Sequence, residues 1–372
     1  MKKIDIVLGL HFGDEGKGNI TNSLATSESL VVRFNGGHQA GHTVTTKRKK
    51  HVFSSFGSGT FKGAATYITE FCTVYPTAFM NELKELGTDA EVYIDAAAMV
   101  TTPYDIYKNI EDAVNIKHGS VGVGFGTTIA RNEANFHLYV RDLLIPTIRD
   151  AKLELMKNHY FNTDTKPDLE VFKKACDAMV DKTTIVDNFQ IITSKYEHII
   201  FEGAQGILLD MDHGFFPNVT RSNTTMKNAM TLINNHINDD VEDIHIYYVT
   251  RSYLTRHGAG FLPNEKETLD FINVNPDETN VSNTYQGKLR YAPLNIDLLY
   301  YAIKSNNLYA TRPVQEHLVI TCMDQLKDPN FITVANSNGD LVTLTKEDFK
   351  IVTNLHYIYT PKLVNFADSI KI

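Results

Sequence analysis

Cysteine is scarce in this sequence. Among its 372 residues are three cysteines, Cys72, Cys176 and Cys322, which lie far apart and are odd in number. This spacing favours neither a disulfide framework nor a metal site of the CxxC type. We therefore expect the protein to work in a reducing compartment.

Long apolar runs are also missing. No stretch approaches the roughly 20 apolar residues that a membrane-spanning helix needs. The chain begins with two lysines after Met1 and then becomes apolar, but Asp5 interrupts the run and Gly9 follows too early for the core of a signal peptide. The sequence predicts a cytoplasmic protein with no membrane partner.

An excess of positive charge is absent as well. The formal net charge is −8 and the pI is near 6.0, whereas binding to a nucleic-acid backbone requires a basic surface. We therefore expect no nucleic-acid partner. The one dense basic run, Lys47–Lys50, is typical of a solvated loop, although such a run can also attract a phosphate.

Repeats, low-complexity segments and Pro/Ser-rich linkers are not found, so nothing in the sequence marks a domain junction. The composition, 42% hydrophobic and 22% charged, suits a chain with a large core. Length alone would allow two or three domains, but α/β folds with one extended sheet often reach this size. We predict a single domain over residues 1–372.

Short β-branched runs alternate with segments that are long enough for helices. The runs are Ile4–Leu10, Leu30–Phe34, Glu91–Ile94, His198–Phe201, Ile244–Val249 and His317–Thr321. Between them, Tyr75–Leu86 and Leu138–Lys157 have the apolar spacing and charge distribution of helices. This alternation is typical of a parallel sheet with crossover helices. The predicted fold is α/β, with a single large, mostly parallel sheet flanked by helices.

A glycine-rich motif, Gly-Asp-Glu-Gly-Lys-Gly at Gly13–Gly18, follows the first predicted strand. Glycine permits turns in which successive backbone N–H groups point at an anion, as in a phosphate-binding loop. The motif differs from a Walker A loop because Gly18 follows Lys17 and leaves no hydroxyl to hold magnesium. Asp14 would then supply that function or another one. The alternative is a glycine-rich connection with exposed charges.

A second motif, Asn-Gly-Gly-His-Gln-Ala-Gly-His-Thr at Asn35–Thr43, follows the next predicted strand. We expect both motifs at the carboxyl ends of neighbouring strands, where ligands bind in open α/β sheets. A histidine beside a phosphate loop can remain protonated and donate to a phosphate or a developing oxyanion. Taken alone, a histidine such as His38 or His42 is more often structural.

Two further blocks make the pattern specific. Phe201–Asp210 reads Phe-Glu-Gly-Ala-Gln-Gly-Ile-Leu-Leu-Asp and continues to Thr225, and Thr255–Gly260 reads Thr-Arg-His-Gly-Ala-Gly. With the two motifs above, these blocks resemble adenylosuccinate synthetase, in which the last segment is Thr-Arg-Val-Gly-Ala-Gly. The resemblance implies the adenylosuccinate synthetase fold, which is P-loop NTPase-like, and a homodimer.

In that family, L-aspartate is joined to the 6-position of a purine nucleotide after a nucleoside triphosphate has phosphorylated the 6-oxygen. The resemblance implies that Asp14 removes the purine N1 proton and binds Mg²⁺ together with the Gly41 carbonyl, while His42 donates toward the 6-oxygen. The implied catalytic residues are Asp14, Lys17, His42 and Gln205. The implied triphosphate-binding residues are Gly13, Glu15, Gly16, Lys17, Gly18, Gly41, Thr43 and Asp324.

The resemblance also implies a set of substrate-binding residues. They are Asn35, Gln39, Ser120, Val121, Arg131, Gln205, Thr220, His257, Asn283, Thr284 and Arg290. Gln205 and Thr220 would contact the purine nucleotide. Arg131, or alternatively Arg141, matches the arginine that the family lends across the dimer. Arg290 would hold the carboxylates of aspartate.

Some positions depart from the family pattern. The phosphate-binding threonine is replaced by Val121, so that Ser120 or Thr127 would take its place. The arginine that would reach the ribose hydroxyls aligns near Gly287, which weakens the case for a ribonucleotide. Asp324 would still accept from a guanine base, but the family's lysine two positions earlier is Cys322. GTP and ATP, or dATP, therefore both stay open as phosphoryl donors.

These departures resemble a viral branch of the family that acts on dGMP to make 2-amino-2'-deoxyadenylosuccinate. We predict dGMP as the substrate, and the host cytoplasm as the location in that case. Members of that branch often carry a small residue where Asp14 stands, so IMP with GTP is the alternative. More remote alternatives are a nucleotide-binding protein without catalysis, against which the intact Asp14, Lys17, His42 and Gln205 argue, and a generic phosphoryl transferase.

Overall fold

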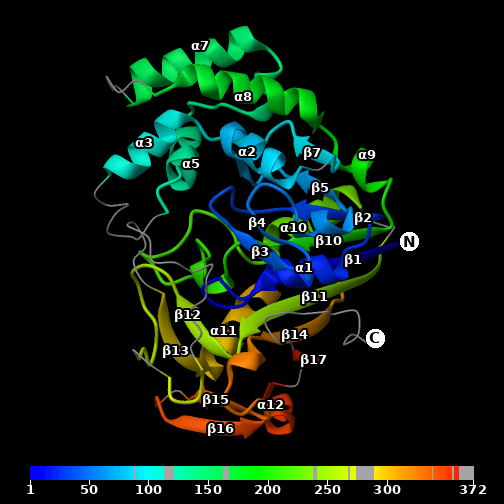
Figure 1. The fold of residues 1–372 in the computed structure, drawn as a ribbon, viewed down its shortest axis with the longest axis vertical. Helices are drawn as coiled ribbons and strands as arrows, with labels where there is room; N and C mark the ends of the chain where they lie inside the picture. Colours follow the sequence, from blue (N-terminus) through cyan, green and yellow to red (C-terminus); the bar gives the residue numbers. More distant parts are fainter. Residues whose placement is uncertain are drawn as a thin grey trace.

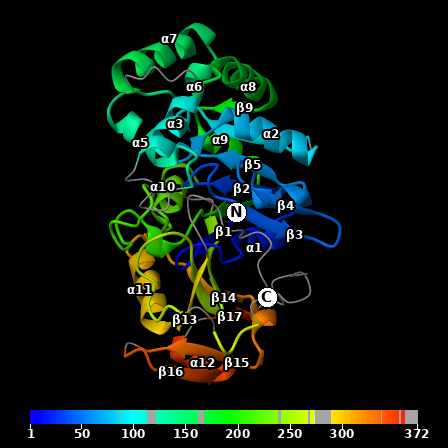
Figure 2. The same cartoon turned by 60° about the vertical axis from the view of Figure 1, so that its left-hand side comes forward.

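The computed structural model describes residues 1–87, 89–112, 121–161, 167–237, 241–266, 269–273, 289–336, 338–353 and 356–359. A large central sheet occupies the middle of the molecule. A group of helices lies at one end of the long axis and a smaller sheet lies at the other end (Figures 1 and 2).

The central sheet has nine strands within the described residues. In chain order they are β1 (Lys2–Gly9), β2 (Ser29–Arg33), β5 (Ala65–Ile68), β7 (Val92–Asp95), β9 (Thr184–Val186), β10 (His198–Glu202), β11 (Val241–Arg251), β14 (Gln315–Thr321) and β17 (His356–Tyr359). Their order across the sheet is β17-β14-β11-β1-β10-β2-β5-β7-β9, and every neighbouring pair is parallel. All six predicted strand runs lie in this sheet. The predicted α/β fold with one large parallel sheet is therefore confirmed.

Helices cover both faces of this sheet. They are α1 (Lys17–Leu24), α2 (Pro76–Leu86), α8 (Leu169–Lys182), α9 (Phe189–Thr193), α10 (Lys227–His236) and α11 (Ile296–Asn307). Successive residues of a strand point to opposite faces: Val7 of β1 clusters with Ile20 of α1, whereas Ile6 clusters with Met230 of α10. Burial on both faces explains why the central strands read as continuous apolar runs.

The predicted helices are present, but one of them is divided. The helix predicted over Tyr75–Leu86 is α2, which begins at Pro76. The helix predicted over Leu138–Lys157 is two helices, α6 (Val140–Leu143) and α7 (Pro146–Met156). Pro146 lacks an N–H group and so starts a new helix instead of continuing the first. No helix in the described part of the chain has the length and apolarity to cross a membrane.

A second sheet, with four strands in the part of the chain that the structure describes, was not predicted. It contains β12 (Tyr253–Arg256), β13 (Arg290–Asn295), β15 (Phe331–Ala335) and β16 (Leu341–Thr345), and α12 (Lys346–Thr353) lies beside it (Figure 1). The helices at the opposite end include α3 (Pro103–Glu111) and α5 (Phe125–Glu133). Short pairs are formed by β3 (His42–Thr45) with β4 (Lys50–Phe53) and by β6 (Thr73–Val74) with β8 (Met99–Val100). Short 3-10 helices are η1 (Ser58–Lys62), η3 (Ile207–Leu209) and η5 (Met323–Gln325).

Candidate active site

The loops that carry the predicted site follow strands in the middle of the central sheet. Since these strands are parallel, the segments after β1, β2, β10, β11 and β14 leave the sheet at the same edge. The two glycine-rich motifs follow β1 and β2, which we predicted to be neighbours. In the structure β10 lies between them, and its last residue, Glu202, enters the site.

The loop after β1 turns sharply before α1. Gly13 and Gly16 have φ angles of 88° and 93°, a left-handed conformation that glycine adopts without strain. The N–H of His11 donates to Glu15 Oε1 at 2.6 Å, and Thr321 Oγ1 donates to the Glu15 carbonyl at 2.8 Å. No described side chain caps the N-terminus of α1, so its first N–H groups are available to an anion.

Lys17 is the first residue of α1 and is buried beneath this loop. Its Nζ donates to the main-chain carbonyl of Gln205 and lies 3.8 Å from Glu15 Oε2. Burial lowers the pKa of Lys17, and the carboxylates of Glu15, Asp14 and Glu202 oppose this shift. The ammonium of Lys17 thus links the loop after β1 to the loop after β10.

His42 is the first residue of β3 and contacts Glu202. The distance between His42 Nδ1 and Glu202 Oε1 is 2.7 Å, and both side chains are buried. Burial tends to raise the pKa of Glu202, but its contacts with His42 and with Ser58 outweigh burial and bring the pKa to about 2. Burial lowers the pKa of His42, although Glu202 opposes this. The pair is therefore a carboxylate that accepts from the Nδ1–H of the imidazole, with burial and Glu202 acting in opposite directions on the pKa of His42.

Asp14 is held at two of its atoms, by the last residue of β11 and by the residue that follows β12. Its φ angle is 56°, and its carbonyl accepts from Arg251 Nε at 2.5 Å. Its carboxylate Oδ2 lies 3.2 Å from His257 Nε2. The side chain of Asp14 is 35% exposed, whereas that of His257 is 15% exposed. The carboxylate of Asp14 is therefore fixed on one side and accessible on the other.

The predicted nucleotide-binding residues after β2 and β10 have different surroundings. The Asn35 amide exchanges two hydrogen bonds with the backbone of Ala204, at 3.1 and 2.8 Å. Asn35 therefore joins the two loops, and its contact with substrate stays a prediction. Gln39 and Gln205 each have buried side-chain polar atoms with no partner among the described residues. Such atoms are costly unless a water or ligand satisfies them, which keeps both as candidates.

Two predicted arginines are already engaged within the subunit. Arg131 is fully buried and pairs with Asp105 at 3.0 Å, while it also donates to the carbonyls of Val100 and Phe136. A guanidinium used in this way cannot reach a second subunit, so the prediction for Arg131 is corrected. Arg290 pairs with Glu265, which an incoming aspartate carboxylate would have to displace.

The remaining predicted residues lie at the edge of the site or outside the described residues. Ser120, Asn283 and Thr284 are outside the described residues, and Val121 is half-buried where the described chain resumes. Asp324 is exposed in η5, three residues beyond Thr321. Half-buried side chains are found at Thr43 on β3 and at Thr220, whose N–H donates to the Leu209 carbonyl at 2.8 Å.

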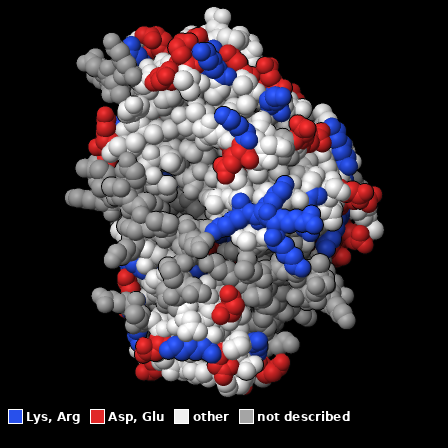
Figure 3. Space-filling model, in the orientation of Figure 1, with Lys and Arg blue, Asp and Glu red and all other residues white. Residues whose placement is uncertain are grey.

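The basic run Lys47–Lys50 covers the turn between β3 and β4 and the first residue of β4. All of its side chains are exposed, as predicted for a solvated loop. Figure 3 shows Lys and Arg side chains gathered near the middle of the face that carries this hairpin. Because β3 begins with His42, the positive charge lies on the same hairpin as a candidate catalytic residue.

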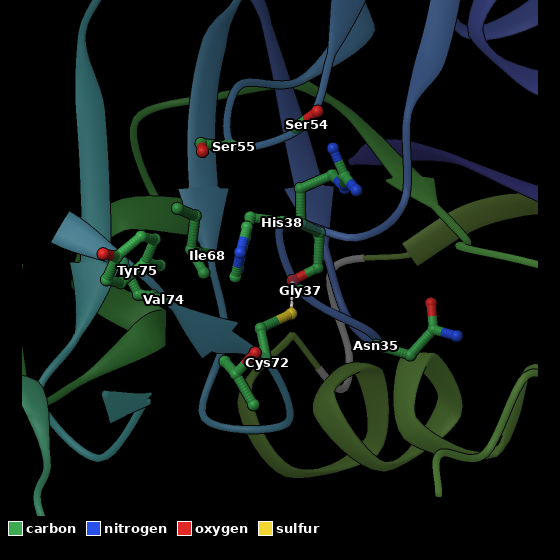
Figure 4. Close-up of a pocket in the computed structure, with 11 residues that line it drawn as sticks. Asn35, Gly37, His38, Ser54, Ser55, Ile68, Cys72, Val74 and Tyr75 are labelled. Carbon is green, nitrogen blue, oxygen red and sulfur yellow. Dashed lines mark hydrogen bonds between the residues drawn. The ribbon is translucent and has the colours of Figure 1, made fainter. Parts of the chain in front are cut away.

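A small pocket lies beside His38 rather than beside His42 (Figure 4). Its lining residues are Arg33, Asn35, Gly37, His38, Ser54, Ser55, Ile68, Cys72, Thr73, Val74 and Tyr75. The His38 ring lies 5.2 Å from the ring of Tyr75, measured between centroids. Burial lowers the pKa of His38 to about 4. The two histidines of the second motif therefore do different things: His38 packs in this pocket, whereas His42 contacts Glu202.

The oxygen donors at this edge suit a magnesium ion better than a softer metal. The described residues contain no cluster of three or more His, Cys, Asp or Glu side chains that could hold a metal alone. Asp14 offers one accessible carboxylate, and Gly41 offers a main-chain carbonyl on the exposed approach to β3. Mg²⁺ in phosphoryl-transfer sites is usually held by one or two protein oxygens, with water and substrate phosphates completing its shell. The donor set fits that pattern.

Comparison with known proteins decides the family. The model of the family described as adenylosuccinate synthetase matches residues 6–360. The chain belongs to the adenylosuccinate synthetase family. An adenylosuccinate synthetase from Saccharophagus degradans is 32% identical over 290 residues, which are 72% of this chain and 66% of that protein. The chain thus spans just under two thirds of the length of that relative.

Two solved structures share the fold of this adenylosuccinate synthetase family member. A fully ligated adenylosuccinate synthetase from Plasmodium falciparum superposes with a TM-score of 0.75 at 22% identity, covering 91% of this chain and 82% of that one. The succinoaminodeoxyadenylate synthetase of cyanophage S-2L, bound to dGMP and to dATP as an energy donor, gives a TM-score of 0.63 at 14% identity, covering 95% and 99%. At these identities the likeness concerns the fold.

Sequence reasoning missed two residues of the site. Glu202 was part of a recognised block, but no role was predicted for it, although an acidic residue at the end of a buried strand is itself a signal. Arg251 was not singled out at all. Arg251 is the last residue of β11, as Glu202 is the last residue of β10. Its contact with the Asp14 carbonyl depends on the order of strands in the sheet, which the sequence does not display.

Proposed function

We propose that this chain joins L-aspartate to the 6-position of a purine nucleoside monophosphate through a 6-phosphoryl intermediate, using a nucleoside triphosphate. The observation that carries the proposal is the position of Lys17, which follows Asp14 by three residues and donates from Nζ to the Gln205 carbonyl. The carboxylates of Asp14 and of Glu202, the partner of His42, both act on its charge. A phosphoryl donor bound by this lysine and by the N-terminus of α1 would lie between a carboxylate and an imidazole.

Each group has a defined part in the proposed reaction. Asp14 takes the purine N1 proton, so that the 6-oxygen becomes nucleophilic and attacks the terminal phosphorus of the triphosphate. The bond from that phosphorus to the bridging oxygen breaks, and the nucleoside diphosphate leaves with the bonding electrons. His42 stabilises the negative charge that develops on the oxygens of the phosphoryl group during its transfer. The aspartate amine then attacks C6, and the 6-phosphoryl group leaves as phosphate with its bonding electrons. Bound Mg²⁺, with Asp14 and Gly41 among its ligands, would neutralise charge on the phosphates.

The substrate that we favour is dGMP. The argument from sequence is the position near Gly287, which lies outside the described residues. A cyanophage enzyme that shares the fold is bound to dGMP and dATP. IMP with GTP is the second candidate, because Asp14 is present here. We propose in addition that the protein is a homodimer and acts in the cytoplasm, which would be that of a host cell if its source is viral.

Phosphate release measured on the purified protein tests the proposal. The assay combines ATP, GTP or dATP with aspartate and either dGMP or IMP, in the presence of Mg²⁺. We expect release that requires aspartate and is fastest with dGMP. Turnover of IMP alone would reject dGMP, and release that does not require aspartate would favour a plain phosphoryl transferase.

Two substitutions test the assigned roles. Asp14→Ala and His42→Ala should each lower the rate of aspartate-dependent phosphate release by about 100-fold or more, because each removes a group that takes part in the reaction: a general base or an oxyanion donor. Both variants should keep the wild-type circular dichroism spectrum. Unchanged release in either variant would reject the role of that residue. No aspartate-dependent release from the wild type would instead favour a nucleotide-binding protein without this chemistry.

A further inference from the structure

We propose that His257 positions the carboxylate of Asp14 for proton removal, an inference that rests on the proposed function. It is based on the 3.2 Å contact between His257 Nε2 and Asp14 Oδ2. The corresponding position in the family segment quoted above is valine, which has no hydrogen-bonding group. In this chain the general base therefore has a polar partner that the family pattern does not supply.

The contact completes a two-point attachment of Asp14. Its backbone is in the left-handed region, with φ 56°, and its carbonyl accepts from Arg251 Nε. A fixed backbone leaves only the two side-chain torsions of Asp14 free. An imidazole at Oδ2 restricts both torsions and leaves Oδ1 for the proton on the purine. His257 would thus supply the orientation on which an efficient proton transfer depends.

His257 is itself held in place by its neighbour. Arg256 is buried and donates to the carbonyls of Asn218 and Phe261, each at 2.8 Å. Its guanidinium also lies over the ring of Phe12, 4.5 Å from the ring centre. The backbone on either side of His257 is therefore anchored to other parts of the fold. His257 is a constrained residue of the site and not a mobile surface histidine.

The same loop provides a way to separate positioning from a merely structural role. The carbonyls of Gly258 and Gly260 accept from Arg290 Nη1, each at 2.9 Å. Arg290 is the candidate ligand for the carboxylates of aspartate. If His257 only maintained the loop, its removal would displace Arg290 and raise the KM for aspartate. If it orients Asp14, its removal lowers kcat and leaves that KM unchanged.

The test uses the full chain with His257→Val and the matched control His257→Gln, whose amide nitrogen reaches as far as Nε2 and can still donate. We expect His257→Val to lower kcat by about 10- to 100-fold, the range for a misplaced catalytic group, with the KM for aspartate within about 2-fold. His257→Gln should recover most of the lost kcat. A rise in the KM for aspartate at constant kcat, or no effect of His257→Val, would overturn the proposal.

A double-mutant cycle tests the contact between Asp14 and His257 separately from the proposed function. In the Asp14→Asn background, adding His257→Val should cause no further loss of activity, because the residue acts through Asp14. In urea unfolding, the effects of the two substitutions on stability should also fail to add, since the side chains are in contact. If the wild type shows no aspartate-dependent release with dGMP or IMP, the proposed function fails. Additive effects on unfolding would overturn the Asp14–His257 pairing independently.

Discussion

His42 Nδ1 and Glu202 Oε1 lie 2.7 Å apart, and both side chains are buried at the carboxyl edge of the central sheet. Glu202 also accepts from the backbone N–H of Ser58 at 3.0 Å, so its orientation is fixed independently of His42. A carboxylate at Nδ1 places the imidazole proton on that nitrogen. His42 Nε2, which has no partner among the described residues, is then the atom that can face a substrate.

Replacing Glu202 by glutamine should impair catalysis more than binding. The Glu202→Gln amide carries no charge, so it would hold the His42 ring less firmly and would no longer stabilise its protonated form. We expect kcat to fall by about 100-fold or more, as in catalytic pairs of this kind, with the KM for the nucleotide changed by less than about 3-fold. Steady-state phosphate release measures both quantities.

Glu82→Gln is the matched control for this substitution. Glu82 is also a buried carboxylate that accepts backbone N–H groups, from Ser54 at 3.0 Å and Ser55 at 2.7 Å. It lies on α2, outside the proposed catalytic groups. Its substitution should leave kcat nearly unchanged. Equal losses of kcat in both variants would mean that Glu202 matters only for folding.

The sequence was most informative where a pattern is local. Runs such as Ile4–Leu10 predicted the strands because burial on both faces selects apolar residues. The glycine-rich loop was recognisable because Gly13 and Gly16 adopt left-handed backbone conformations that other residues tolerate poorly. The helix predicted over Leu138–Lys157 is divided at Pro146. This division could have been predicted, because a proline inside a helical pattern ends or starts a helix.

The site was harder to predict where it depends on contacts between distant segments. The insertion of β10 between β1 and β2 brings Glu202 to His42 across 160 positions of sequence. Strand order of this kind leaves no local signal. The role of Arg131 was misjudged for a similar reason, because its partner Asp105 is fixed by the packing of α3 on α5.

The burial of His38 predicts a specific loss of stability in acid. Its pKa is about 4 in the folded protein against an ordinary value of 6.5. The unfolded chain therefore binds more protons between these values, and stability is lost as pH falls from about 6.5 to about 4. The contribution of His38 to this loss in the free energy of unfolding should reach about 3 kcal/mol near pH 4. His38→Phe keeps a ring against Tyr75 and should remove this part of the pH dependence in urea unfolding. Identical slopes for the two proteins would contradict the prediction.

Arg131 should matter for stability, and Arg141 should not. Removing one member of a buried ion pair typically costs 3–5 kcal/mol, so Arg131→Met should lower the free energy of unfolding by about that amount. Arg141 is exposed and lies over the ring of Tyr139, 4.4 Å from its centre. Arg141→Met should change stability by less than about 1 kcal/mol. If Arg141 is the arginine lent across the dimer, its variant should show a raised KM for the nucleotide. A stable Arg131→Met protein with a raised KM would restore the original prediction for Arg131.

Gly9, the last residue of β1, has no room for a side chain. A methyl group there would lie 2.3 Å from the Gln205 carbonyl oxygen and 2.6 Å from Lys17 Nζ. Since such distances are impossible, Gly9→Ala must displace the lysine or the loop after β10, and we expect aspartate-dependent phosphate release to fall by about 100-fold. Overpacking should also lower the free energy of unfolding by about 1–3 kcal/mol.

Gly126→Ala is the control, because the nearest atom to its new methyl group is 3.7 Å away. Alanine within a helix such as α5 should raise stability by about 0.5–1 kcal/mol. Wild-type activity in Gly9→Ala would show that the close contact between β1 and Lys17 does not set the geometry of the site.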